Sequence, residues 1–73
     1  MQRYEAKSEV TGLVWKVLKT VGETVTEGDT LMILESMKIE IPVASEKEGT
    51  VVDVRVAEGL PVTEGETLMV IEY

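Results

Sequence analysis

The sequence contains no cysteine and no histidine. Without cysteine, the chain has no disulfide bond and no thiolate chemistry. The lack of both residues also excludes catalytic triads of the Ser/His or Cys/His kind, zinc sites built from Cys and His, and proton transfer by an imidazole. We therefore expect no catalytic residue and no metal site, and a small enzyme is the least favoured class of function.

Basic residues are also scarce, with 7 Lys and Arg against 14 Asp and Glu, for a net charge of −7. Nucleic acids and anionic membranes both require a basic surface, so neither is an expected partner. The longest purely apolar run, such as Leu31–Leu34, has four residues, whereas a membrane-spanning helix needs about 20. The first residues lack the apolar stretch of a secretory signal. We expect a soluble protein in the cytoplasm.

The chain is short, at 73 residues. Independent domains begin at about 50 residues, and a single core is marginal in stability at this size. We therefore expect one domain that covers residues 1–73.

An internal repeat organises this domain. Residues 12–35 align with residues 49–72 at a constant offset of 37 without a gap, and 12 of the 24 positions are identical. Solenoids need three or more repeats, so two copies indicate halves that are related by a pseudo-two-fold axis and share one core. The intervening residues 36–48 have no counterpart in this alignment, and we look for function there.

Both copies have the composition of β-strands, because Val, Ile and Thr are abundant and the signals that mark the start of a helix are weak. We predict strands over residues 3–7, 13–18, 30–35, 39–43, 50–56 and 67–72, with short extended segments around Val25 and Val62. Glycines at regular spacing mark the turns. Four of them are expected to adopt positive φ, namely Gly22, Gly28, Gly59 and Gly65. The sequence thus predicts an all-β sandwich or small barrel.

Apolar positions that the copies share predict the core, and they are Val14/Val51, Val17/Val54, Val25/Val62, Leu31/Leu68 and Ile33/Val70. Val14 and Val17 are three residues apart, and a regular strand would place them on opposite faces. Because both copies keep this spacing, we predict a bend or bulge in each of these strands.

Lys38 is the candidate functional residue. Residues 39–43 alternate in polarity like a half-buried strand, so Met37 and Lys38 fall where one strand reverses into the next. Neither residue suits a tight hairpin, which usually contains Asn-Gly or Asp-Gly, and a broken local rule often marks a functional position. Of five lysines, Lys38 is the one at a predicted exposed turn with large apolar neighbours, Met37 and Ile39.

The residues around Lys38 offer no catalytic machinery. Glu35 and Glu40 bracket the turn, but a pair for acid–base work is not indicated without a histidine or a nucleophile nearby. Ser36 has no base partner, and we interpret it as structural or solvated. A primary amine, in contrast, attacks an activated carboxyl group to give a stable amide. Lys38 is therefore a candidate for covalent attachment.

The run Glu35-Ser36-Met37-Lys38-Ile39 resembles the biotin attachment signature of the biotinyl/lipoyl carrier domain family, which centres on Met-Lys-Met. Ile39 stands in place of the second Met. The turn at residues 22–31 and the run Gly49-Thr50-Val51 also resemble the family pattern. The resemblance extends over about residues 10–73, nearly the whole chain.

This resemblance implies a flattened barrel of two four-stranded antiparallel sheets with quasi-two-fold symmetry, with Lys38 on an exposed hairpin opposite the termini. It implies that a biotin protein ligase joins biotin to the Lys38 amine and reads Glu35, Met37 and Ile39. The domain would then be a non-catalytic carrier that shuttles carboxyl groups between a biotin carboxylase and a carboxyltransferase.

Two alternatives place a different function on the same turn. Lipoyl carriers typically have an acidic residue before the lysine and Ala after it, so Met37 and Ile39 favour biotin over lipoate, although acceptance of both cofactors stays open. The other alternative is an unmodified interaction module that docks through residues 37–39.

Overall fold

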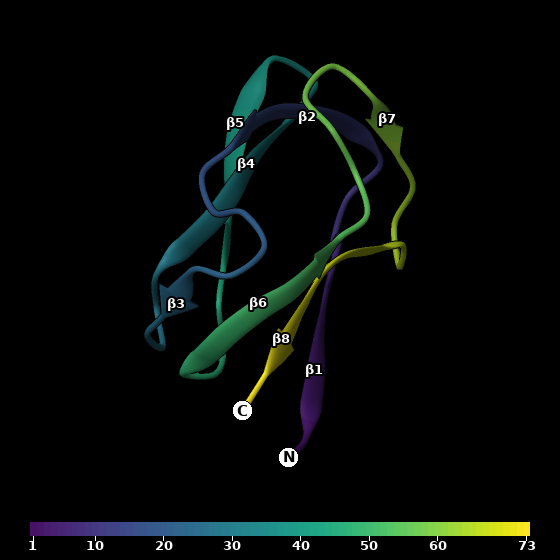
Figure 1. The fold of residues 1–73 in the computed structure, drawn as a ribbon. Coiled ribbons are helices and arrows are strands. Elements are labelled where there is room, and N and C mark those ends of the chain that lie inside the picture. Colours follow the sequence, from purple (N-terminus) through teal and green to yellow (C-terminus); the bar gives the residue numbers. More distant parts are fainter.

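The computed structural model describes residues 1–73 as eight β-strands without a helix (Figure 1). No helix is therefore long and apolar enough to cross a membrane. The predicted strands are all present, with ends shifted by up to two residues. They are β1 (Arg3–Lys7), β2 (Gly12–Val17), β3 (Thr24–Val25), β4 (Thr30–Ser36), β5 (Ile39–Ala44), β6 (Gly49–Val54), β7 (Pro61–Val62) and β8 (Thr67–Glu72).

The strands form two four-stranded antiparallel sheets. Sheet A has the order β1-β8-β6-β3 and sheet B the order β5-β4-β2-β7. The molecule is elongated, with extents of 36 × 17 × 17 Å, and both termini lie at one end of it (Figure 1). This arrangement confirms the expected all-β fold of two antiparallel sheets, each built mainly from one copy of the repeat.

The structural repeat is longer than the sequence repeat. Arg3 pairs with Glu72 as Glu40 pairs with Glu35, and the other pairs between β1 and β8 match those between β5 and β4 at the same offset of 37. Residues 1–11 are thus the counterpart of residues 38–48, and the expectation that residues 36–48 have none is wrong. The alignment missed this because β1 and β5 are largely exposed edge strands with few constrained side chains.

Two buried serines show how closely these segments correspond. The Ser8 Oγ donates a 2.6 Å hydrogen bond to the carbonyl of Val10, and the Ser45 Oγ donates one of the same length to the carbonyl of Lys47. The backbone N–H groups of Gly65 and Gly28 donate to the carbonyls of these two serines, at 2.8 Å each. Both serines are therefore satisfied in the interior.

The core consists of symmetry-related pairs from both sheets. Its buried residues are Val14/Val51, Val25/Val62, Leu31/Leu68, Met32/Met69 and Leu34/Ile71, together with Ala6. Burial of one such side chain stabilises the fold by roughly 1.5–3 kcal/mol. Neither half could bury its apolar face without the other, so the two copies stabilise one another.

β-bulges explain the apolar spacing and correct part of the predicted core. The register between β2 and β4 shifts at Trp15, and that between β6 and β8 shifts at Val52, as predicted from the Val14 to Val17 spacing. Val17 and Val54 face inward but are only partly buried.

A second bulge corrects the prediction for Ile33, whereas Val70 is buried as predicted. The pairing of β4 with β5 skips Leu31, and that of β1 with β8 skips Leu68. This extra residue changes the alternation, so Met32 and Leu34 point into the core. Ile33 is only partly buried, and Val70 is buried but lies outside the core cluster.

The glycines serve two purposes. Gly22, Gly28, Gly59 and Gly65 adopt φ between 89° and 95°, which confirms their predicted role in turns. Gly12 and Gly49 instead allow close approach, because a Cβ at either position would collide with a backbone carbonyl oxygen, that of Glu35 or of Glu72.

Replacement of Gly49 by alanine tests this close approach. The φ of Gly49 is not positive, so the backbone conformation itself would accept alanine. The collision of its Cβ with the Glu72 carbonyl oxygen is the obstacle. We expect Gly49→Ala to lower the free energy of unfolding by about 1–3 kcal/mol, as overpacking does. Chemical denaturation would measure it, and a variant as stable as the wild type would contradict the assigned role.

Candidate functional site

The turn between β4 and β5 lies at the end of the molecule opposite the termini (Figure 1). Lys38 is exposed, and the apolar side chains on either side of it are exposed as well, Met37 to 91% and Ile39 to 63%. The predicted position of Lys38, at the tip of a hairpin away from the termini, is what the structure shows. Its amine is accessible to a large partner.

The backbone of this turn is strained. Ser36 pairs with Ile39, which leaves a two-residue loop, and φ is 53° at Met37 and 66° at Lys38. Positive φ at both central residues is the pattern of a type I′ turn, which normally selects Asn and Gly. These are the two residues other than glycine with positive φ in the chain. Each such conformation costs about 1–3 kcal/mol, so the surrounding structure holds the turn in place.

Three features hold the turn. The β4–β5 ladder runs from Thr30 paired with Ala44 up to the Ser36–Ile39 pair. Gly12 lets β2 lie directly against the carbonyl of Glu35. In addition, the Ser36 Oγ donates a 3.0 Å hydrogen bond to the carbonyl of Thr11. Of the two roles that the sequence left open for Ser36, structural or solvated, the structure shows the first, because this bond joins the turn to the β1–β2 loop.

The turn joins the two copies of the repeat. At the opposite end, Gln2 and Tyr73 exchange two backbone hydrogen bonds of 2.8 Å. By the offset of 37, this pair corresponds to Ile39 and Ser36, and the termini form the same hairpin without a connection. Met37 and Lys38 thus close a hairpin that the other half leaves open.

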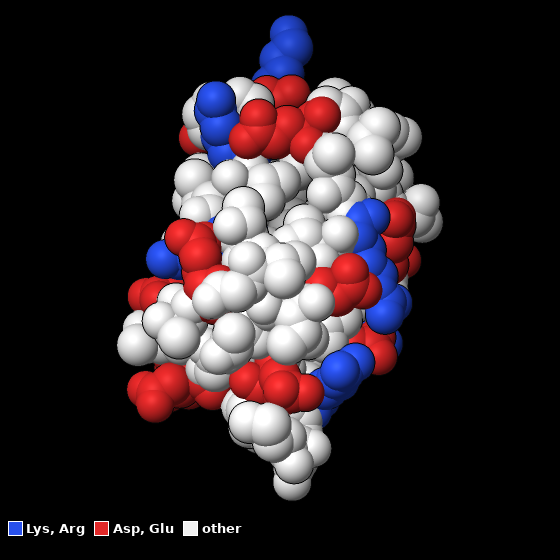
Figure 2. All heavy atoms as spheres, viewed as in Figure 1, with Lys and Arg blue, Asp and Glu red and all other residues white.

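Acidic side chains lie beside the turn. Glu35 and Glu40 are directly opposite each other on β4 and β5, and neither makes an ion pair or a side-chain hydrogen bond. Figure 2, in the orientation of Figure 1, shows carboxylates gathered just below a projecting basic side chain at this end of the molecule. Like charges in opposite positions are destabilising, so this arrangement does not serve the stability of the hairpin.

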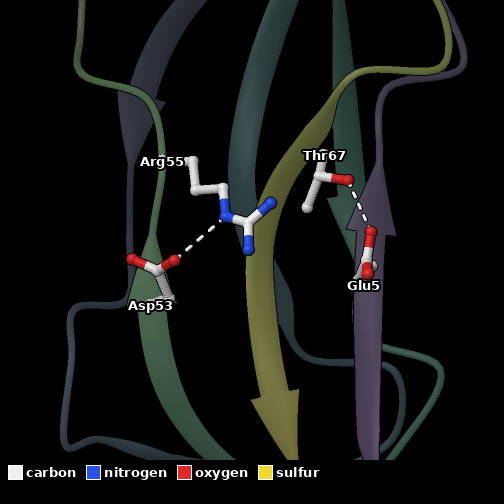
Figure 3. Close-up of polar contacts among 4 residues, drawn as sticks. All are labelled: Glu5, Asp53, Arg55 and Thr67. Atoms are coloured by element: carbon white, nitrogen blue, oxygen red, sulfur yellow. Dashed lines mark hydrogen bonds and ion pairs between the residues drawn. The ribbon is translucent and has the colours of Figure 1, made fainter.

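The outer faces of the two sheets differ in polarity. On sheet A, the Arg55 Nε donates to Asp53 at 2.9 Å, and the Thr67 Oγ1 donates to Glu5 at 2.7 Å (Figure 3). At the equivalent positions of the other copy, 37 residues away, Leu18 stands in place of Arg55 and Pro42 in place of Glu5. Sheet B therefore has no side-chain hydrogen bonds equivalent to these two. Exposed apolar side chains lie instead on β2 and beside it, at Leu13, Trp15, Leu18 and Leu60.

The groups with shifted pKa values lie away from the turn. The N–H of Thr26 donates a 2.8 Å hydrogen bond to the Asp29 carboxylate, which lowers the pKa of Asp29. Burial and then the Glu46 carboxylate raise the pKa of Tyr4. Tyr4 lines a hollow of about 470 Å³ between β1 and β5. Lys38 does not line this hollow, so the site is an exposed tip and not a pocket.

Residues 5–71 match the model of the biotin/lipoyl family, which is described as "Biotin-requiring enzyme". This chain belongs to that family. The match covers both copies of the repeat and the turn between them, so the family fold and the symmetry of the chain agree.

Individual relatives in the family agree with this result. The chain is 40% identical over 43 residues to the biotin/lipoyl attachment protein of Bacillus subtilis, a match that covers 59% of each chain. It superposes on the urea carboxylase of Kluyveromyces lactis with a TM-score of 0.92 and 35% identity, over 99% of this chain and 6% of that one. The lipoyl domain of the 2-oxoglutarate dehydrogenase complex from Azotobacter vinelandii gives a TM-score of 0.75 and 26% identity, over 88% and 81%.

Family and fold together make this chain a carrier domain of the type found in biotin-dependent carboxylases. It spans less than two thirds of the Bacillus attachment protein and a small part of the carboxylase.

The strain in the turn can be measured with two substitutions at Lys38. Lys38→Gly removes the side chain and relieves the positive φ, whereas Lys38→Ala removes the side chain and keeps the strain. We expect Lys38→Gly to have the higher free energy of unfolding, by about 1 kcal/mol, in urea titrations. Equal stability of the two variants would show that the turn is relaxed.

Proposed function

We propose that Lys38 is the attachment site for biotin, joined to the lysine Nζ as an amide by a biotin protein ligase. The observation that carries the proposal is the position of this one lysine at the tip of a strained turn, between two exposed apolar side chains. Membership of a biotin-requiring family supports the choice of cofactor. An exposed primary amine has the chemistry that an activated carboxyl group requires.

The shape of the domain suits a carrier. Lys38 lies at one end of a body 36 Å long, and the termini lie at the other end. A group on Lys38 therefore projects away from any chain that is linked to the termini. When bound, biotin supplies the carboxyl-transfer chemistry, and the domain supplies its position. Tethering raises the concentration of the cofactor at each site that it visits. We propose that these sites are a biotin carboxylase and a carboxyltransferase.

In this proposal, the ligase recognises the residues that flank the lysine. Met37 and Ile39 offer exposed apolar surface, and large exposed apolar groups mark interaction sites. Glu35 lies two positions before Met37 on the outer face of β4, with Glu40 opposite. Lipoate at the same lysine is the competing cofactor. The mass of the group that each ligase adds distinguishes biotin from lipoate.

Mass spectrometry of the modified chain tests the attachment site. We expect one biotinyl group on the wild-type chain after co-expression with a biotin protein ligase, and none on Lys38→Arg. Lys47→Arg is the matched control, because Lys47 is also exposed, and this variant should be modified fully. Parallel co-expression with a lipoyl ligase should leave the wild-type chain unmodified.

Other outcomes of this experiment contradict the proposal. A lipoyl group in place of biotin would make the domain a lipoyl carrier. No addition under either ligase would leave an unmodified interaction module as the function. Biotin that persists on Lys38→Arg would place the site elsewhere.

The contribution of Met37 is tested by a change of polarity. Met37→Asp replaces an apolar side chain that would contact the ligase by a charged carboxylate. We therefore expect kcat/KM of the ligase for this domain to fall about tenfold or more. Met37→Leu keeps the apolar surface and should stay within about threefold of the wild type. Equal rates for the Asp variant and the wild type would show that the ligase does not read this side chain.

A further inference from the structure

The end of the molecule that carries Lys38 has side-chain hydrogen bonds that its symmetry mate lacks. The Ser36 Oγ donates to the carbonyl of Thr11 at 3.0 Å, and the Thr11 Oγ1 accepts from the N–H of Glu64 at 3.1 Å. These two bonds join the β4–β5 turn, the β1–β2 loop and the β7–β8 loop. We call Ser36, Thr11 and Glu64 the latch.

The repeat provides an internal comparison for the latch. By the offset of 37, Ser36 corresponds to Tyr73 and Thr11 corresponds to Glu48. Tyr73 and Glu48 take part in no side-chain hydrogen bond, although the backbone pairing around them matches that at the other end. The terminal end lacks these two bonds and has other side-chain contacts, a 3.5 Å hydrogen bond from Arg3 Nε to Glu72 and the Lys47 Nζ 5.0 Å from the centre of the Tyr73 ring. The latch is confined to the end where the chain has a strained turn and an exposed lysine.

The close approach at Gly12, which Gly49 repeats at the other end, allows the latch to form. At Gly12, a Cβ would lie 3.2 Å from the Ser36 Cβ and would collide with the Glu35 carbonyl. Because Gly12 has no side chain, the first residue of β2 lies against the last residues of β4. This contact brings the carbonyl of Thr11, the residue before Gly12, within reach of the Ser36 hydroxyl.

We propose that the latch positions the Lys38 turn for the enzyme that modifies it. This inference rests on the proposed function, and it adds Ser36 and Thr11 as positioning residues that act through the turn without contact to the cofactor. Residues with positive φ other than glycine relax readily to other conformations when they are unsupported. A loss of the latch therefore lowers the population of the turn that the ligase binds, without a change in the lysine.

This mechanism has a specific kinetic signature. When only a fraction of molecules has the competent turn, the apparent affinity of the ligase for the domain falls by that fraction, while the bound complex reacts as before. We expect Ser36→Ala to raise the KM of a biotin ligase for the domain about threefold to tenfold, which is the effect of one hydrogen bond. The kcat should stay within about twofold of the wild type.

Three further variants separate positioning from a general effect on the fold. Ser36→Thr keeps the hydroxyl and should restore the wild-type KM. Thr11→Val removes the acceptor of the Glu64 N–H and should raise KM in the same way. Thr24→Val is the matched control, because Thr24 lies on strand β3 at an exposed position and its hydroxyl makes no hydrogen bond. NMR measurement of φ at Met37 and Lys38 in each variant reports the turn directly.

The outcomes distinguish the latch from the proposed function. A KM for Ser36→Ala within twofold of the wild type, a rise in KM as large for Thr24→Val, or a failure of Ser36→Thr to restore it would overturn the positioning role. If the wild-type chain is not biotinylated at all, the proposed function fails and the role in ligase recognition fails with it. In that case unchanged φ values at Met37 and Lys38 in Ser36→Ala would also show that the latch does not hold the turn.

Discussion

The structure depends on burial of one apolar core that two copies of the same segment build together. Each copy contributes the same five core positions, and neither sheet could cover its inner face without the other. This requirement explains how 73 residues fold without a disulfide. It also explains why the identical positions of the repeat lie mostly in the core and at the turns, while the outer faces of the two sheets have diverged.

The proposed function is located where this symmetry is broken. The core and ladders fix both ends of the molecule alike, but one end has open termini and the other has a two-residue connection. Since Ser36 and Ile39 are paired, that connection has two residues, and positive φ at both of them is the pattern of a type I′ turn. Met37 and Lys38 are poor residues for such a turn, and their positive φ costs stability. Strain of this kind at an exposed lysine fits a position kept for recognition.

Much of the fold was predictable from the sequence, and the errors have a common cause. Strand positions, the turn glycines and the bulges at Trp15 and Val52 follow from the repeat. The assignment of Ile33 to the core was wrong because the bulge at Leu31 reverses the alternation of β4. Met32 and Met69 were missed for the same reason, although both copies contain them. The correspondence of β1 with β5 was missed because exposed edge strands keep few identities.

The sequence by itself determined that this chain is a duplicated all-β domain and that Lys38 lies at a reversal between two strands, since hydrophobic period and turn chemistry are local properties. Tertiary structure alone decided that the N-terminal strand completes the symmetry and that Met37 and Lys38 both adopt positive φ. It also decided that Ser36, Thr11 and Glu64 meet beside the turn. The place of the N-terminal strand and the meeting of Ser36, Thr11 and Glu64 depend on contacts between residues that lie 25 to 69 positions apart, which sheet pairing brings together and which no local pattern records.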